Sequence, residues 1–118
     1  MEKQIAWNQI DDTASEMIEA SDSIWEYAET AFLETDSMET LCELLRKEGF
    51  EVEEGVAGIP TAFKGIFGFG KPVIGFLGEY DALSGLNQVA GAWKRSPQQD
   101  NPALQPKLRH QSWFPSLR

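Results

Sequence analysis

The sequence predicts an α/β fold in which two N-terminal helices precede a partial mixed sheet, followed by an irregular C-terminal tail. Three observations lead to this class. Apolar residues recur at helical spacing over residues 14–45, strand-like patterns follow over residues 50–78, and neither period continues beyond residue 92. The length of 118 residues allows one hydrophobic core at most.

The first element is predicted to be a long amphipathic helix over residues 3–29. Its apolar positions are three, four and seven residues apart and lie along one stripe: Ala14, Met17, Ile18, Ile24, Trp25 and Ala28. The opposite face is acidic, and charge on the outer face of an amphipathic helix is normally solvated. We therefore expect this acidic face to be a solvent-exposed surface.

A second helix is predicted to start after Asp36, a suitable N-cap, with Glu39 three residues later as in a capping box. Gly49 can adopt the left-handed conformation that ends a helix, and Phe50 can fold back on the last turn. The expected buried face comprises Met38, Leu41, Cys42, Leu44 and Leu45. Cys42 is accordingly expected to be a core side chain rather than a metal ligand.

The pattern then changes to strands. Residues 50–53 alternate, residues 61–67 are strand-like, and residues 68–71 are predicted to form the turn of a hairpin. Pro72 can open the next strand, and residues 73–78 (VIGFLG) form a nearly continuous apolar run. Such a run is typical of a central strand covered on both sides, so we predict one here.

Residues 65–71 (GIFGFGK) also fit the first seven positions of a phosphate-binding loop. The next position, however, is Pro72, which lacks the hydroxyl that would contact Mg²⁺. A strand is predicted next, where such a loop requires a helix N-terminus to hold the phosphates. The hairpin interpretation is therefore preferred, and an ATPase is excluded.

Two carboxylates, Glu79 and Asp81, follow the predicted central strand. Residues two apart on a strand share a face, and open α/β sheets bind ligands at the C-terminal ends of their strands. Paired carboxylates repel each other, so such pairs usually serve a cation or acid–base chemistry. The alternative is that both are solvated residues before the turn at residues 83–86. Their spacing leaves both interpretations open.

Charge and proline content change near residue 92. Residues 1–92 carry 18 acidic and five basic side chains, whereas residues 93–118 carry one acidic and five basic side chains and four of the six prolines. The acidic part would repel phosphate backbones, so we expect no nucleic-acid binding. We predict that residues 1–92 form part of a single domain. Residues 93–118 are predicted to be a disordered basic tail.

No apolar run reaches the roughly 20 residues of a membrane span, and the first residues mix charge and polarity unlike a signal peptide. The single cysteine cannot form an internal disulfide. We therefore expect no membrane association and a cytoplasmic location.

Three separated blocks carry a family resemblance: residues 24–32 (IWEYAETAF), residues 41–63 (LCELLRKEGFEVEEGVAGIPTAF) and residues 70–91 (GKPVIGFLGEYDALSGLNQVAG). In this order they resemble the N-terminal portion of the zinc-peptidase-like, metal-dependent amidohydrolases. Within that family they are most similar to the p-aminobenzoyl-glutamate hydrolase branch, in the subunit designated B, alongside the aminoacylases. The resemblance spans roughly residues 15–91.

The resemblance implies a two-domain hydrolase whose catalytic α/β domain binds a divalent metal, zinc or manganese. Its substrates would be small molecules, with cleavage of the amide bond in N-acyl or aminobenzoyl amino acids or dipeptides. In such enzymes the metal polarises the carbonyl and activates water, while a carboxylate moves the proton. The resemblance places Asp81 where an aspartate orients the metal site, and Glu79 where some branches have a metal-binding histidine and others an acid.

The chain departs from the family after residue 92. Where this branch continues into a ligand-bearing GHGCGHN segment, the chain reads WKRSPQQDNPALQPKLRHQSWFPSLR. His110 has no partner histidine and is expected to be a solvated tail residue. We hypothesise that the reading frame or gene model diverges between residues 92 and 100, which would leave an inactive N-terminal fragment that binds no metal.

A second hypothesis is a small acidic, non-enzymatic module. Such a module would bind a partner subunit, or a copy of itself, through the unfinished edge of its sheet.

Overall fold

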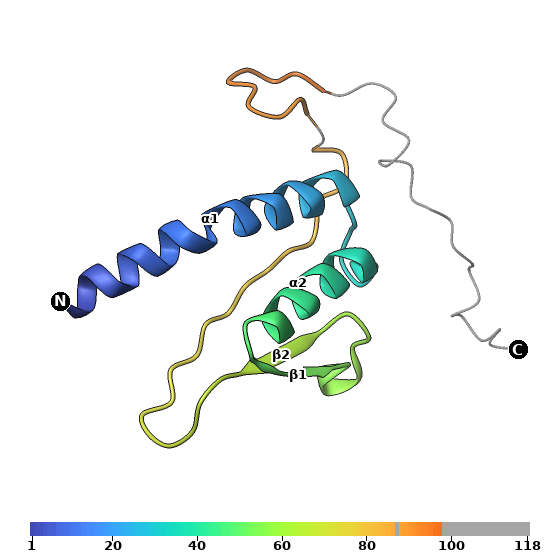
Figure 1. The fold of residues 1–118 in the computed structure, drawn as a ribbon. Coiled ribbons are helices and arrows are strands. Elements are labelled where there is room, and N and C mark those ends of the chain that lie inside the picture. The colour runs from blue at the N-terminus through green and yellow to red at the C-terminus, as the bar shows by residue number, and fades with distance from the viewer. Residues whose placement is uncertain (87, 98–118) are drawn as a thin grey trace, which may run out of the picture.

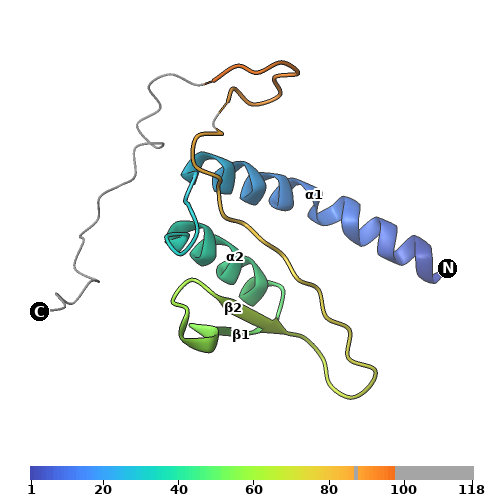
Figure 2. The same cartoon turned by 180° about the vertical axis from the view of Figure 1, so that it is seen from behind.

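The computed structural model describes residues 1–86 and 88–97 (Figure 1). The elements follow in the order α1 (Glu2–Tyr27), α2 (Thr35–Lys47), β1 (Glu51–Glu54), the 3₁₀ turn η1 (Val56–Gly58) and β2 (Phe63–Ile66). Helix α2 lies between α1 and the β1–β2 hairpin, as views from opposite sides show (Figures 1 and 2). Two helices followed by a small sheet confirm the predicted α/β class.

Helix α1 contacts α2 through its C-terminal half. Ala20, Ile24 and Tyr27 are half-buried there, and the Tyr27 hydroxyl lies 3.4 Å from Thr40 Oγ1. Residues 1–12, by contrast, are all exposed. The predicted apolar stripe is covered only in part, because Met17, Ile18 and Trp25 remain exposed even in the half of α1 that α2 reaches.

Helix α2 begins two residues earlier than predicted, with Glu34 at the N-cap position and Asp36 inside the first turn. The prediction of Asp36 as the N-cap is therefore wrong. The free N–H groups of this turn are satisfied from outside the helix, because the Glu29 carboxylate accepts hydrogen bonds from the backbone N–H of Asp36 at 3.0 Å and of Ser37 at 2.8 Å.

The C-terminal end of α2 follows the sequence prediction. Gly49 adopts a φ of 86°, and the backbone N–H of Phe50 donates to the Leu45 carbonyl at 2.9 Å. Cys42 has no exposed surface and lies in the core, as predicted. Across the helix from α1, Leu45 packs over the hairpin at Gly65, where an added Cβ would lie 3.0 Å from Leu45 Cδ1.

The hairpin is formed by different segments from those predicted. β1 pairs with β2 in antiparallel register from Glu51 opposite Ile66 to Glu54 opposite Phe63. The connection between the paired strands is thus residues 55–62, and the predicted hairpin turn at residues 68–71 is wrong. No helix among the described residues is long and apolar enough to cross a membrane.

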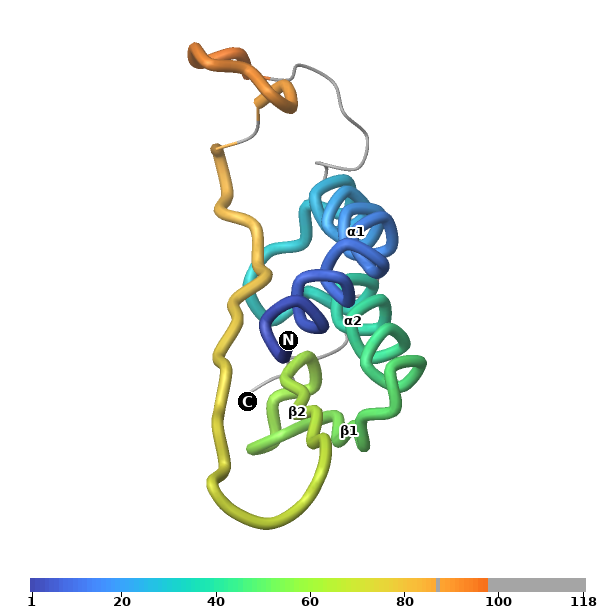
Figure 3. Tube along the Cα trace, turned by 60° about the vertical axis from the view of Figure 1, so that its left-hand side comes forward, coloured from blue at the N-terminus to red at the C-terminus, as the bar shows by residue number. Residues whose placement is uncertain are grey.

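The predicted central strand over residues 73–78 is also wrong. The segment is extended but unpaired, and Figure 3 shows it running alone beside the helices and the hairpin. Its large side chains are mostly exposed: Val73 85%, Ile74 74%, Phe76 97% and Leu77 95%. A central strand needs a neighbour on each side, and the sheet in the described part of the chain consists of β1 and β2 alone.

Candidate functional site

Residues 79–82, which contain both predicted site residues, are attached to the folded body at two points. The Ala82 N–H donates to the Glu29 carbonyl at 2.7 Å, and Ala82 forms an isolated parallel bridge with Thr30. The Tyr80 hydroxyl donates to the Thr61 carbonyl. The chain is therefore held in place on both sides of Asp81.

The Tyr80 side chain is half-buried. Its ring packs against Phe63 with centroids 5.7 Å apart at an angle of 47°. Burial raises the pKa of the Tyr80 phenol, and the negative charge of Glu34 raises it further, with smaller effects from Cys42 and Glu29. The phenol thus remains a neutral hydrogen-bond donor throughout the physiological pH range.

Glu79 and Asp81 themselves are exposed. Among the described residues, neither carboxylate makes a hydrogen bond or an ion pair. The predicted strand that was to orient them is absent, so the anchors at Tyr80 and Ala82 are what position Asp81. The catalytic roles assigned to the two carboxylates remain predictions.

Two acidic residues near this segment were not predicted as site residues from the sequence. Glu29 joins the segment over residues 79–82 to the start of α2, since its carbonyl accepts from Ala82 and its carboxylate accepts from Ser37. Glu34 is buried, and its Oε2 has no hydrogen-bond partner among the described residues. The available signal was the presence of acidic residues just before a helix, where the helix dipole favours negative charge.

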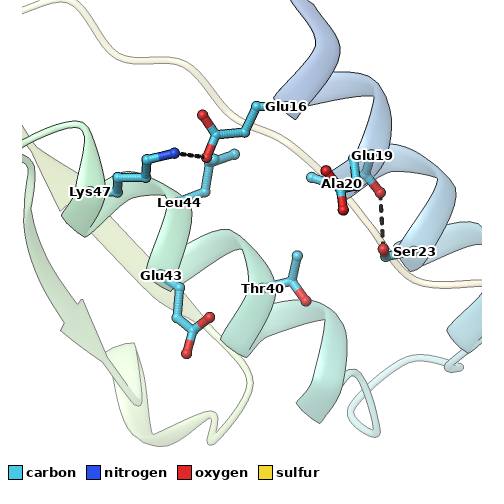
Figure 4. A pocket seen from close by; sticks show the side chains of 8 residues that line it. All are labelled: Glu16, Glu19, Ala20, Ser23, Thr40, Glu43, Leu44 and Lys47. Atoms are coloured by element: carbon cyan, nitrogen blue, oxygen red, sulfur yellow. Dashed lines mark hydrogen bonds and ion pairs between the residues drawn. The ribbon is translucent and has the colours of Figure 1, made fainter. Parts of the chain in front are cut away.

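A shallow groove with a volume of about 320 Å³ lies between α1 and α2. Figure 4 shows its lining, which is Glu16, Glu19, Ala20 and Ser23 from α1 and Thr40, Glu43, Leu44 and Lys47 from α2. The cation in this lining, Lys47, is already paired with Glu16. The groove is thus an acidic surface crossed by one interhelical ion pair, and it shares no residue with the segment that carries Asp81.

The described residues contain no cluster of three or more histidine, cysteine or acidic side chains able to hold a metal ion. Cys42 is enclosed in the core, and burial raises the pKa of its thiol, with the charge of Glu54 adding to this effect. The thiol is therefore held in its protonated form, which is a poor metal ligand. His110 and most of the predicted tail lie outside the described residues.

Comparison with known proteins finds a clear sequence similarity. The chain is 54% identical over 71 residues to the p-aminobenzoyl-glutamate hydrolase subunit designated B of Escherichia coli strain K12. The matched region is 60% of this chain but 15% of that protein. No family model matches the chain, and no solved structure matches it.

This identity supports the family resemblance that the three sequence blocks predicted. An identity of 54% is far higher than unrelated segments of helix and strand would share by chance. Because the chain corresponds to about one seventh of the relative, the similarity concerns one portion of that protein. Over those 71 residues, the chain resembles a subunit of a p-aminobenzoyl-glutamate hydrolase.

Proposed function

We propose that residues 1–92 are the N-terminal part of the catalytic domain of a metal-dependent amidohydrolase. Its reaction would be hydrolysis of the amide bond in p-aminobenzoyl-glutamate or a similar N-acyl amino acid. The observation that carries this proposal is the 54% identity over 71 residues to the Escherichia coli hydrolase subunit.

Within this proposal, Asp81 orients the metal site of the complete hydrolase, and Glu79 is a second candidate. The anchoring of Tyr80 and Ala82 supports the assignment, because it positions the backbone while leaving the Asp81 carboxylate free to accept a hydrogen bond. Such a partner of a metal ligand acts by fixing the ligand's direction rather than by contacting the metal.

The metal that the family implies does not fit the described residues of this chain, because they bring no three candidate ligands together. We therefore assign metal binding to other parts of a complete hydrolase, and we expect this chain by itself to be inactive. Purified chain should retain no stoichiometric zinc or manganese and should not cleave p-aminobenzoyl-glutamate. One tightly held metal ion together with amide cleavage would refute this.

The proposal that residues 1–92 are part of a catalytic domain is best tested in a chimera. The matched 71 residues of the Escherichia coli protein are replaced by the corresponding residues of this chain, and the holoenzyme is assayed with p-aminobenzoyl-glutamate. We expect the chimera to be active, because the two segments should form the same part of the domain. A chimera that folds and assembles but has no activity would contradict the proposal.

Asp81→Asn in the active chimera tests the role of this residue. Loss of a hydrogen-bonding partner of a metal ligand typically reduces metal affinity or activity about 10–100-fold. The control is Glu26→Gln, which removes an exposed carboxylate of α1 and should leave activity unchanged. Equal activities of the two variants would remove Asp81 from the site.

The second candidate function is a non-enzymatic module that binds a partner. The observation that favours it is the exposed apolar segment over residues 73–77, because a contiguous exposed apolar patch often marks an interaction surface. An inactive chimera together with a specific complex of the chain would favour this function over the first.

A further inference from the structure

The segment that carries Asp81 is held by two parts of the fold that are far apart in the sequence. Before Asp81, the Tyr80 hydroxyl donates to the carbonyl of Thr61 in the loop between β1 and β2. After it, the Ala82 N–H donates to the carbonyl of Glu29 in the α1–α2 connection at 2.7 Å. The two acceptors thus hold the chain on either side of the Asp81 carboxylate, which stays exposed.

The Glu29 carbonyl is itself held in place, because the carboxylate of the same residue is bonded to the start of α2. This carboxylate accepts hydrogen bonds from the N–H of Asp36 at 3.0 Å, from the N–H of Ser37 at 2.8 Å and from the hydroxyl of Ser37 at 2.8 Å. Hydrogen bonds to a charged group are roughly twice as strong as those between neutral groups. The position of Ala82 therefore depends on the bonds that the Glu29 side chain makes to α2.

The α1–α2 connection has an unfavourable backbone conformation at one residue. Phe32 has a φ of 67°, in a region that bulky side chains rarely adopt. Phe32 is also 70% exposed, so burial of its ring does not offset the cost. Such residues persist where the surrounding contacts impose the conformation, and they are frequent at functional sites. The bonds of Glu29 to α2 and to Ala82 are contacts of this kind.

We propose that Tyr80 and Glu29 are positioning residues of the hydrolase, which act on catalysis by fixing the direction of the Asp81 carboxylate. This inference rests on the proposed function, because Asp81 orients a metal site only in a complete hydrolase. A carboxylate that orients a metal ligand must keep its own direction. A displacement of about 1 Å at a reacting centre costs about 100-fold in rate, so loss of either anchor should be measurable.

Tyr80→Phe in the active chimera tests the first anchor. It removes the hydroxyl that bonds Thr61 and keeps the ring that packs against Phe63. We expect kcat/KM for p-aminobenzoyl-glutamate to fall about tenfold. The matched control is Tyr27→Phe, which removes the hydroxyl of another half-buried tyrosine, 3.4 Å from Thr40 Oγ1, and should leave kcat/KM unchanged.

Glu29→Gln tests the second anchor. The amide has one acceptor oxygen where the carboxylate has two, so at least one bond to the start of α2 is lost. We again expect kcat/KM to fall about tenfold. Ser37→Ala removes only the hydroxyl that bonds Glu29 and should have a smaller effect in the same direction.

A double-mutant cycle separates positioning from general damage to the fold. Asp81→Ala leaves no carboxylate to position, and the side chain that it removes is exposed. If Tyr80 and Glu29 act through Asp81, Tyr80→Phe and Glu29→Gln should change kcat/KM by less than about twofold in the Asp81→Ala chimera. General damage to the fold would instead lower kcat/KM by the same factor in both backgrounds.

Amide hydrogen exchange of the separate chain measures the two anchors without catalysis. Relative to the amides of α2, the Ala82 amide should exchange at least about tenfold faster in Tyr80→Phe and in Glu29→Gln than in the unmodified chain. Tyr27→Phe should leave this ratio unchanged, because its hydroxyl contacts only the α1–α2 interface.

The possible results distinguish failure of the positioning roles from failure of the proposed function. A folded but inactive chimera contradicts the proposed function, and the positioning roles with it. An active chimera overturns the positioning roles alone if kcat/KM does not respond to Tyr80→Phe and Glu29→Gln, or if it falls equally with and without the Asp81 carboxylate. Unchanged exchange of the Ala82 amide in both variants would also overturn them.

Discussion

At the scale of single residues, Glu29 connects several elements, because its carboxylate accepts three hydrogen bonds at the start of α2. Its Oε2 accepts from both the backbone N–H and the hydroxyl of Ser37, each at 2.8 Å, and its Oε1 accepts from the Asp36 N–H. A carboxylate that receives several hydrogen bonds at a helix N-terminus satisfies free donors and complements the helix dipole. Glu29 therefore joins α1, α2 and the Asp81 segment in one arrangement.

Glu29→Gln should lower the free energy of unfolding by about 1–2 kcal/mol, since it removes the charge from bonds at the helix start. The measurement is urea denaturation followed by circular dichroism at 222 nm. Glu26→Gln, which alters an exposed acid of α1 with no described partner, is the matched control. If both variants unfold at the same urea concentration, the Glu29 bonds contribute nothing.

Because of Cys42, we expect the free energy of unfolding to fall as the pH rises through the alkaline range. Burial, and then the Glu54 charge, raise the pKa of the Cys42 thiol, while the Arg46 charge opposes the shift. The folded chain therefore keeps a proton that the unfolded chain releases. Stability due to the thiol is complete below its ordinary pKa of about 8.5 and falls as the pH rises from there through the folded-state pKa.

Urea denaturation of the unmodified chain and Cys42→Ala across this pH range measures the effect. The alanine variant should be less stable at neutral pH because of the cavity, but it should lose less stability as the pH rises. Parallel losses in the two proteins would show that the thiol does not contribute.

Reaction of Cys42 with a thiol reagent should also be slow in the folded chain and fast in urea, because the side chain is fully buried.

At the scale of elements, α1 consists of two halves with different surroundings. Its C-terminal half packs on α2 and carries the Glu16–Lys47 ion pair, whereas residues 1–12 are exposed on every side. Surface ion pairs contribute at most about 1 kcal/mol. Tertiary packing usually supplies most of a helix's stability, so the first half is held mainly by its own backbone bonds.

Amide hydrogen exchange should reveal this division. Amides of residues 5–12 should exchange at least about tenfold faster than amides of residues 38–47 in α2, because local opening there breaks no tertiary contact. Mass spectrometry of peptides after timed exchange resolves both regions. Equal protection would mean that the first half of α1 is covered, for example by another chain.

At the scale of the whole molecule, the described residues bury little apolar surface. Cys42 is the only fully buried apolar side chain among them, and the other buried residues are Glu34, Ser37 and Thr61. Large apolar side chains remain exposed on α1 and in the segment over residues 73–77. Since apolar burial is the dominant favourable contribution to folding, the chain should be only marginally stable.

A shallow unfolding transition follows from this small core. The urea m value should lie near the lower end of the range for small proteins, about 1 kcal/mol/M, because little surface is newly exposed on unfolding. The dye ANS should bind the folded chain, and Phe76→Lys should reduce that binding more than Lys3→Glu does. A steep transition without dye binding would show that the exposed apolar surface is covered in solution.

The sequence by itself determined the elements whose causes are local. Helical spacing predicted α1 and α2, and Gly49 predicted the end of α2. Alternation predicted β1 and a strand-like pattern predicted β2, since each depends on residues only a few positions apart. The tertiary structure alone decided that Glu29 replaces Asp36 at the start of α2, because the donor and acceptor groups are seven and eight residues apart. It also decided that residues 73–78 remain unpaired. An apolar run specifies that a strand can be buried, but burial requires neighbouring strands, and neither β1 nor β2 pairs with this segment.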